Sequence, residues 1–291
     1  MKNFLQQNLG DLMKIIDLHT HSTYSDGTLT PTQLVKKAEN IGLYAIALTD
    51  HDTVSGLYEF EKVSTKIIKV PGVEISVQMK DFNFHMVGLF IDVKKGEIEE
   101  KLKILQKARA ERNKKIIEKL KSHGFKIDLD ELKEIAGEQL GRPHIAFMLT
   151  KKGYFSTPEE AFEKCLKKGA FAYVEKFRFS PDTAIKMIKN SKGLAILAHP
   201  GLINISTDKK IALVDYLKNL GLDGIEVFYS DHTKEDEELF MKIAKERKLL
   251  ISGGSDYHGE NKKGIELGFG RGNLSIDFKY LEEMLKFLEV R

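Results

Sequence analysis

Short apolar runs that recur between helical segments constrain the fold of this chain more than any other feature. Tyr44–Leu48 and Gly193–Ala198 are uninterrupted apolar runs, which are typical of parallel strands covered on both faces. Gly224–Phe228 and Leu249–Gly254 are of similar length, and segments with helical patterning lie between most of these runs. We count about seven strands that alternate mostly with helices, which predicts an α/β barrel or a doubly wound sheet.

Local signals predict some of the boundaries between these elements. Thr30 as a cap, Pro31 at the first helical position and Gln33 at the third favour a helix that runs to about residue 41. Ser55 is expected to cap the next helix. The link between the apolar segments at residues 67–75 and 82–91 is too short for a crossover helix, so we expect an antiparallel or bent pair there.

The pattern changes in the middle of the chain, where residues 97–168 are mostly helical and rich in charge. We therefore predict a barrel domain formed by residues 1–96 and 170–291, with an inserted helical subdomain at residues 97–169. The insert carries a basic run, which consists of Lys101, Lys103, Lys107, Arg109, Arg112, Lys114 and Lys115. This run is either a solvated helix face or a surface that guides a polyanion.

Composition excludes several classes of protein. The formal net charge of +3 over 291 residues is too small to indicate nucleic-acid binding from bulk charge. The single cysteine, Cys165, excludes an intramolecular disulfide, and its amphipathic surroundings favour a buried, inert thiol. No apolar run reaches the length of a membrane span. Residues 1–12 are expected to form an arm or short helix without signal-peptide features, so we expect a cytoplasmic protein, and no protein partner is evident.

The stretch from Asp17 to Gly27 contains the first candidate metal ligands. His19 and His21 follow an apolar run at positions two apart, and on an extended backbone such residues face the same side. Asp26 precedes Gly27 in a turn and can return toward the histidines as an oxygen ligand. Two solvent-facing histidines at a strand end are the alternative interpretation.

Similar polar groups follow the other predicted strands. The candidates are His19, His21, Asp50, His51, His199, Asp256 and His258 past strand ends, with Glu74 and His85 inside or near strands. In an α/β barrel the carboxyl ends of the strands converge on one face, which would bring these groups together. Clustered acids and imidazoles are costly unless a cation offsets them. Imidazole and carboxylate without thiolate suit Zn, Mn or Fe, and so many ligands suggest two or three divalent ions.

These residues closely resemble the motifs of the polymerase-and-histidinol-phosphatase (PHP) family of metallophosphoesterases, from Ile16 to Asn273. The motifs are His-x-His-x-x-x-x-Asp-Gly, Thr-Asp-His-Asp, Pro-Gly-Val-Glu, Phe-His-x-x-Gly, Ala-His-Pro and Gly-Ser-Asp-x-His-Gly. The resemblance implies a distorted (β/α)7 barrel, which resembles a TIM barrel, with a trinuclear site. One ion would take His19, His21, Glu74 and Asp256; a second would share Glu74 and add His85 and His199; a third would take Asp26, His51 and His258.

Two further motifs resemble the branch with nucleoside 3′,5′-bisphosphate phosphatases and 5′-to-3′ exonucleases of short RNA. They are Gly141-Arg142-Pro143-His144 and Tyr229-Ser230-Asp231-His232. On this resemblance Arg142, His144 and His232 bind the substrate phosphate. A guanidinium suits that role because it matches phosphate as a fork. The alternative for Arg142 to His144 is an ordinary helix start with proline at its first turn.

The sequence thus predicts a metal-dependent phosphoric ester hydrolase in which a metal-bridging hydroxide attacks a nucleotide or a short 5′-phosphorylated oligonucleotide. Asp50 and Asp52 are expected to orient His51 rather than bind metal. Histidinol-phosphate phosphatase or another phosphomonoesterase is the alternative enzyme. A metal-loaded regulatory module without turnover, and an amidohydrolase of the TIM-barrel type, are the alternatives from other classes.

Overall fold

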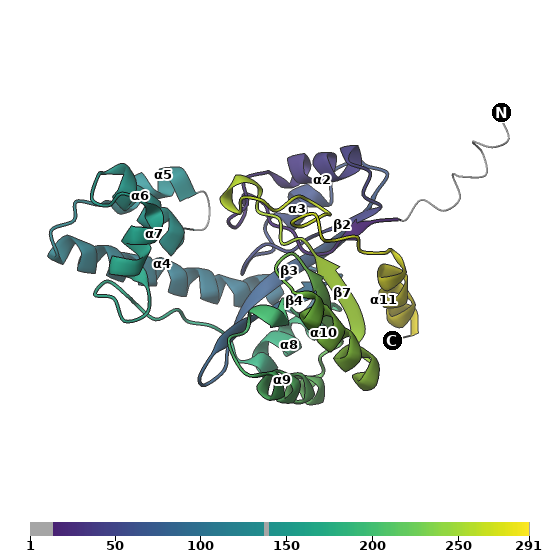
Figure 1. Ribbon diagram of the computed structural model, residues 1–291. Coiled ribbons are helices and arrows are strands. Elements are labelled where there is room, and N and C mark those ends of the chain that lie inside the picture. Colours follow the sequence, from purple (N-terminus) through teal and green to yellow (C-terminus); the bar gives the residue numbers. More distant parts are fainter. Residues whose placement is uncertain (1–13, 137–139, 291) are drawn as a thin grey trace.

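The computed structural model describes residues 14–136 and 140–290, so the arm expected at residues 1–12 lies outside the described residues. Its seven strands form one sheet in chain order (Figure 1). They are β1 (Ile16–Asp17), β2 (Ala45–Leu48), β3 (Ile68–Gln78), β4 (Asn83–Leu89), β5 (Leu194–Leu197), β6 (Gly224–Tyr229) and β7 (Leu250–Gly254). All neighbouring strands pair in parallel except β4, which is antiparallel to both β3 and β5. The antiparallel pair expected from the short link is confirmed.

The sheet curls until its first and last strands meet. The Leu18 amide donates to Gly253 O at 3.1 Å, and Thr20 forms a parallel bridge with Tyr257. The fold is therefore a nearly closed α/β barrel, as the resemblance implied, and it is distorted because one strand runs against the others. A doubly wound sheet is excluded by the sequential strand order.

Helices surround this barrel. They are α2 (Pro31–Asn40), α3 (Leu57–Phe60), α8 (Pro181–Asn190), α9 (Thr207–Leu220), α10 (Lys234–Arg247) and α11 (Lys279–Val290), with short 3-10 turns η2 (Pro200–Leu202) and η3 (Gly259–Asn261). The predicted cap of α2 is confirmed, because Thr30 Oγ1 accepts from the Gln33 amide and the Gln33 side chain accepts from the Thr30 amide. The predicted cap at Ser55 is wrong. Gly56 caps α3, and the Ser55 amide instead donates to Thr53 Oγ1 in a local turn.

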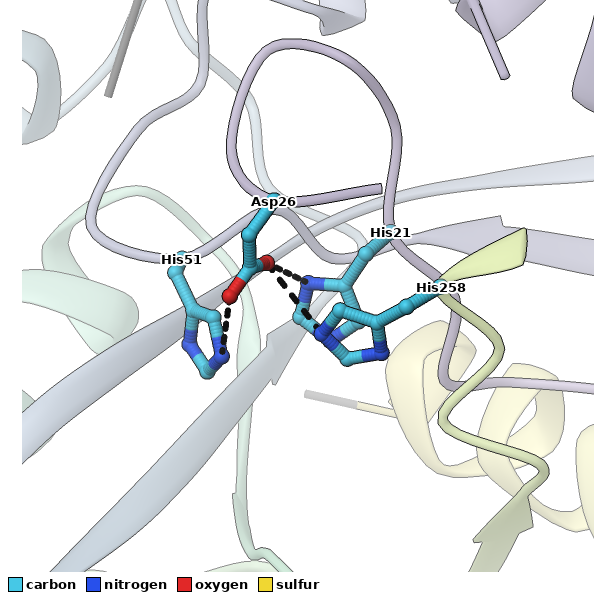
Figure 2. A group of neighbouring side chains, drawn as sticks. All are labelled: His21, Asp26, His51 and His258. Atoms are coloured by element: carbon cyan, nitrogen blue, oxygen red, sulfur yellow. Dashed lines mark ion pairs between the residues drawn. The ribbon is translucent and has the colours of Figure 1, made fainter. Parts of the chain in front are cut away.

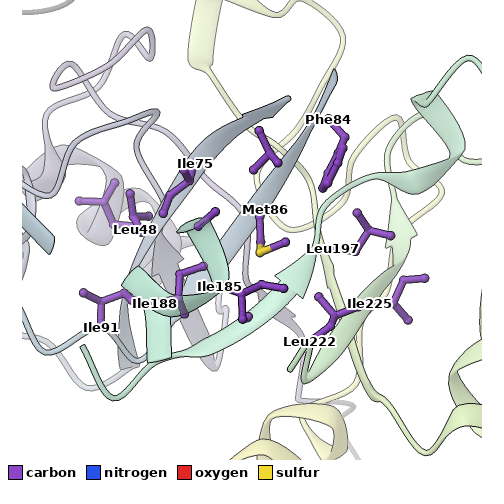
Figure 3. Close-up of a cluster of buried hydrophobic side chains, with 14 of the residues drawn as sticks. Leu48, Ile75, Phe84, Met86, Ile91, Ile185, Ile188, Leu197, Leu222 and Ile225 are labelled. Carbon is purple, nitrogen blue, oxygen red and sulfur yellow. The ribbon is translucent and has the colours of Figure 1, made fainter. Parts of the chain in front are cut away.

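In β2, β4 and β5, alternate residues face two different apolar layers. Ile46 and Leu48 belong to the layer between the sheet and the outer helices, part of which Figure 3 shows. Ala45 and Ala47 belong to a second layer, into which α11 inserts Leu281. This two-residue alternation fills the inside of the barrel with side chains, which leaves the rim as the place for a site.

A helical unit extends from the barrel on α4, at the left in Figure 1. It consists of α4 (Ile98–Ser122), α5 (Leu129–Ala136), α6 (Arg142–Lys151), α7 (Pro158–Ala161) and the π-helical turn η1 (Phe162–Leu166). The first half of α4 packs Leu102 into the layer around the barrel, whereas the second half packs Ile116 into a separate cluster that also contains Cys165. We propose that this cluster is the core of the inserted subdomain and that α4 is shared between both parts.

None of the helices in the described residues combines the length and apolar composition needed to cross a bilayer.

Candidate metal centre

The carboxyl rim of the barrel brings all nine predicted metal ligands together. They come from the segment after β1 (His19, His21 and Asp26), the ends of β2, β5 and β7 (His51, His199, Asp256 and His258), and from within β3 and β4 (Glu74 and His85). His85 lies early in β4, opposite Ser76 of β3. Because β4 runs antiparallel to β3, its first residues reach the same rim as the last residues of the parallel strands. A residue near the start of a parallel strand, by contrast, would lie at the opposite end of the barrel.

Glu74 lies at the centre of this cluster and is completely buried. Its Oε1 lies 2.9 Å from both His85 Nδ1 and His199 Nε2, and its Oε2 lies 2.9 Å from His51 Nδ1. The Nε2 atoms of His19 and His21 lie 3.2 and 3.3 Å from the same Oε2. One carboxylate thus faces five imidazoles, which is the arrangement of a ligand shared between ions.

The potential ligand atoms fall into three overlapping groups, and within each group the atoms lie within 4.8 Å of one another. The groups are His19, His21, Glu74 and Asp256; His51, Glu74 and His85; and His21, Asp26, His51 and His258. Figure 2 shows the last group, in which Asp26 points between the three rings. The first group equals the set implied for one ion. The other two groups differ from the implied sets. His21 belongs to the first and the last group, and His51 belongs to the second and the last, which the sequence did not indicate.

Unsatisfied buried atoms test whether cations fit this cluster. Of the six buried side-chain atoms without a hydrogen-bond partner in the described residues, five belong to the cluster. They are His19 Nε2, His21 Nε2, Asp26 Oδ1, Glu74 Oε2 and Asp256 Oδ1. A buried polar atom without a partner costs about 1–3 kcal/mol, and imidazole nitrogens and carboxylate oxygens are ligands for divalent transition metals. The residues present therefore fit a group of metal ions.

Burial and neighbouring charges set the protonation of the cluster. Burial alone would raise the pKa of Glu74, but His51, His85 and His19 hold it well below its ordinary value. Burial lowers the pKa of His85 to about 4, against the opposing effect of Glu74. A neutral imidazole beside an ionised carboxylate is the state in which both groups can bind a cation.

Two positions in the cluster have strained backbones. The φ angles of His199 and Asp256 are 27° and 55°, a region that residues other than glycine rarely adopt. Gly254, just before Asp256, allows β7 to approach β1 closely, since a Cβ there would lie 2.3 Å from the Cβ of His19. The rim is thus shaped to bring its side chains together at a cost in backbone energy.

A set of supporting residues, which the sequence analysis missed, orients the ligands. Glu226 Oε1 lies 3.0 Å from His19 Nδ1, which leaves Nε2 of that ring free for a cation, and Glu226 Oε2 accepts from the His199 amide at 2.6 Å. Tyr229 and Lys262 both donate to Asp256 Oδ2, at 2.8 Å each. Glu226 could have been found, because it is an acidic residue inside an otherwise apolar strand.

The acids beside His51 contact residues that the sequence analysis did not name. Asp50 accepts from the amide and hydroxyl of Ser22 at 2.7 and 2.6 Å, which fixes the loop after β1. Asp52 pairs with Arg109 at 2.6 Å and with Lys176 at 3.1 Å. Asp52 therefore ties the rim to α4 and to the segment that returns from the helical unit.

The three residues predicted to bind phosphate have different surroundings. The Arg142 guanidinium donates to Leu166 O at 2.9 Å and lies over the rings of Phe162 and Tyr173. His144 is near enough to the rim for Asp26 to act on its pKa, which burial lowers. In His232 both ring nitrogens contact the main chain, with Nδ1 2.8 Å from Val227 O and Nε2 3.1 Å from the Gly201 amide.

Comparison with known proteins gives one consistent family. Residues 17–251 match the PHP domain. A 5′-3′ exoribonuclease of Haemophilus influenzae is 35% identical, over 85% of this chain and 91% of that protein. A 3′,5′-nucleoside bisphosphate phosphatase of Chromobacterium violaceum is 32% identical, over 88% of this chain and 91% of that protein. A solved structure from Bifidobacterium adolescentis, provisionally assigned as a metal-dependent phosphoesterase, superposes with a TM-score of 0.81 at 31% identity, covering 93% and 95% of the two chains.

Fold and rim together define the class of α/β barrels that can hold metal ions among histidines and carboxylates at the carboxyl ends of their strands. Within that class, the chain belongs to the PHP family.

Proposed function

We propose that this protein is a metal-dependent phosphoesterase that hydrolyses nucleotides, with 3′,5′-bisphosphorylated nucleosides and short 5′-phosphorylated oligonucleotides as its substrates. The observation that carries this proposal is the set of five unsatisfied atoms around Glu74 at the barrel rim. The names of the exoribonuclease and bisphosphate phosphatase relatives support the nucleotide as substrate.

The nine rim residues would hold two or three divalent ions, which we propose to be Mn, Fe or Zn. Such ions supply Lewis acidity toward phosphoryl oxygens and a water of lowered pKa. Glu226 holds the His19 ring in one tautomer, and Tyr229 and Lys262 both donate to Asp256 Oδ2, so that His19 Nε2 and Asp256 Oδ1 would be the atoms that bind metal. The protein thereby fixes its ligands before substrate arrives, so that little reorganisation is needed during reaction.

Phosphate recognition is assigned to the start of α6. Burial and the nearby Arg178 lower the pKa of Arg142, although a guanidinium still remains charged at neutral pH. We propose that Arg142 and His144 bind phosphoryl oxygens of the substrate. Because both nitrogens of His232 are engaged with the main chain, we propose that it acts by positioning the segment around Gly201, next to His199.

The test uses His19→Ala and Asp256→Ala, with phosphate release from 3′-phosphoadenosine 5′-phosphate measured in the presence of Mn²⁺. We expect both variants to lose turnover and bound metal, while His123→Ala, at the end of α4 and remote from the rim, keeps both. Unchanged turnover in the first two variants would refute the role of the rim. Hydrolysis of histidinol phosphate without hydrolysis of any nucleotide would refute the proposed substrate.

A further inference from the structure

One face of α4 carries a row of basic residues that begins at the rim and leads away from it. Arg109, Arg112, Lys115 and Lys119 are spaced three or four apart, so they lie on one side of the helix. The first of them pairs with Asp52, the neighbour of His51. Ten residues of helix span about 15 Å, which is the length of the row from the rim outward.

The segment that returns from the helical unit to the barrel runs along the same face of α4. Lys176 meets Arg109 at Asp52. Farther out, Arg112 Nε donates to Val174 O at 2.9 Å, and Lys119 Nζ donates to Tyr173 O at 2.8 Å. The helix and the return segment thus lie side by side from the candidate metal centre outward.

A groove of about 440 Å³ lies between the outer parts of α4 and the return segment. Its lining consists of Lys115, Glu118, Lys119 and Ser122 of α4 with Tyr173 and Val174 of the return segment. The Tyr173 ring also links the groove to Arg142, which we propose binds phosphate, because the Arg142 guanidinium lies 5.7 Å from the centre of that ring. Cations, a hydroxyl and an aromatic face in one groove are the elements by which proteins bind single-stranded nucleic acid.

Four cations in or beside the groove lack an ion-pair partner in the part of the chain that the structure describes. Among the described residues, Arg112, Arg142, Lys115 and Lys119 form no ion pair. Burial, together with the charges of Arg142 and Arg109, lowers the pKa of Arg112 to about 10. Mutually repelling arginines beside a groove are stabilised when an anion neutralises them.

We propose that this groove on α4 binds the nucleotides that follow the reacting 5′ end of a single-stranded oligonucleotide. The inference rests on the proposed function and specifies the part of its substrate that lies beyond the rim. At a stacked rise of about 3.4 Å per nucleotide, the row of about 15 Å accommodates about four nucleotides. Tyr173 stacks on a base, and Lys115 and Lys119 neutralise backbone phosphates.

The test compares kcat/KM for a 5′-phosphorylated RNA pentanucleotide with kcat/KM for 3′-phosphoadenosine 5′-phosphate in the Mn²⁺-loaded protein. For Lys115→Glu, and for Lys115→Glu combined with Lys119→Glu, we expect the ratio of these values to fall, by about tenfold in the double variant at low salt. Tyr173→Ala lowers the ratio by about tenfold through lost stacking. Glu118→Gln raises it by about twofold, because Glu118 is the acid in the groove lining.

A charge-matched control separates the groove from general repulsion. Lys114→Glu reverses a charge on the same helix outside the groove lining, where Lys114 pairs with Glu111, and the ratio should stay within twofold of the parent. The exponent of the salt dependence for the pentanucleotide should fall by about 1.4 in the double variant.

If the unsubstituted protein hydrolysed neither substrate, the proposed function would be refuted. Hydrolysis of both substrates, with a ratio that no groove variant changes or that Lys114→Glu changes equally, would overturn the groove alone. Lys115 forms no ion pair, so Lys115→Glu gives this answer even if the double variant does not fold.

Discussion

The barrel rim and the face of α4 beside it differ in the charge of the ligand that each would bind. At the rim, carboxylates and imidazoles meet and leave buried atoms such as Glu74 Oε2 without a hydrogen bond, so that region lacks cations. Beside it, Arg112 of α4 and Arg142 of α6 repel each other, and neither forms an ion pair among the described residues, so an anion would stabilise that region. A phosphate ester held by metal ions at the rim would meet both needs. The comparison predicts that the two regions respond differently to substitution.

The largest effect is expected at the centre of the rim. Glu74→Ala removes the carboxylate that faces five imidazoles, so we expect turnover to fall by about 10³-fold and bound metal to become substoichiometric. Phosphate release and elemental analysis of the same preparation measure both effects. Glu111→Ala, an exposed carboxylate on α4, is the control and should change neither. Turnover within tenfold of the parent would show that Glu74 is not central.

The junction between the two regions should contribute mainly to stability. Asp52 is completely buried, and its loss leaves the partly buried Lys176 and Arg109 without an anion. Burial opposes ionisation of Asp52, but Lys176 and Arg109 lower its pKa below the ordinary value. We expect Asp52→Asn to lower the free energy of unfolding by about 3 kcal/mol.

Urea denaturation measures this loss, and a double-mutant cycle with Lys176→Met isolates the pair. Additive effects in the cycle would mean that Lys176 and Asp52 do not interact in solution. Asp182→Asn, which breaks the exposed pair with Lys186, is the matched control and should cost less than about 1 kcal/mol.

The sequence predicted the elements with strong local signals. The predicted cap of α2 is Thr30, which precedes Pro31, and the helix ends at Asn40, close to the expected residue 41. These predictions hold because capping and periodicity act within a few residues. The prediction for Ser55 was wrong because serine and threonine hydroxyls stabilise turns as well as helix caps. The local sequence does not decide between a turn and a cap.

Interactions between distant segments could not be predicted. Glu226 reaches His19 across the barrel, and Asp52 pairs with a lysine that is 124 residues away. The ligand types at strand ends were sufficient to indicate a metal site, but the sharing of His21 and His51 depends on ring positions that only the closed barrel fixes. The sequence also did not indicate that α4 packs its two halves into different cores.

A smaller effect on metal binding is expected at Glu226, which orients a metal ligand without belonging to the nine predicted ligands. Glu226→Gln keeps the size of the side chain but weakens its hold on His19 Nδ1, so we expect metal affinity to fall about 10–100-fold. Metal titration of the chelator-treated protein measures the affinity. Excess Mn²⁺ should restore most of the turnover in this variant but not in Glu74→Ala. If excess metal restored neither, Glu226 would be required for more than orienting its ligand.

The smallest effect is expected on the cationic side of the comparison. Arg142→Lys keeps the charge at the start of α6, but an ammonium cannot donate as a fork or lie flat over Phe162 and Tyr173. We expect KM for the mononucleotide to rise about fivefold with kcat within twofold, because this contact binds substrate and transition state alike. Arg142→Met should raise KM further, since it also removes the charge, whereas Arg247→Lys, paired with Asp215 on α9, should change neither constant.

The two Arg142 variants separate the effect of charge from that of side-chain geometry at this position. Equal KM values for Arg142→Lys and the parent, with a raised value for Arg142→Met, would mean that charge alone matters there. If Arg142→Met also left KM unchanged, Arg142 would take no part in mononucleotide binding. The unbalanced cations on α4 would then have to act on longer substrates, because a mononucleotide at the rim would not reach them.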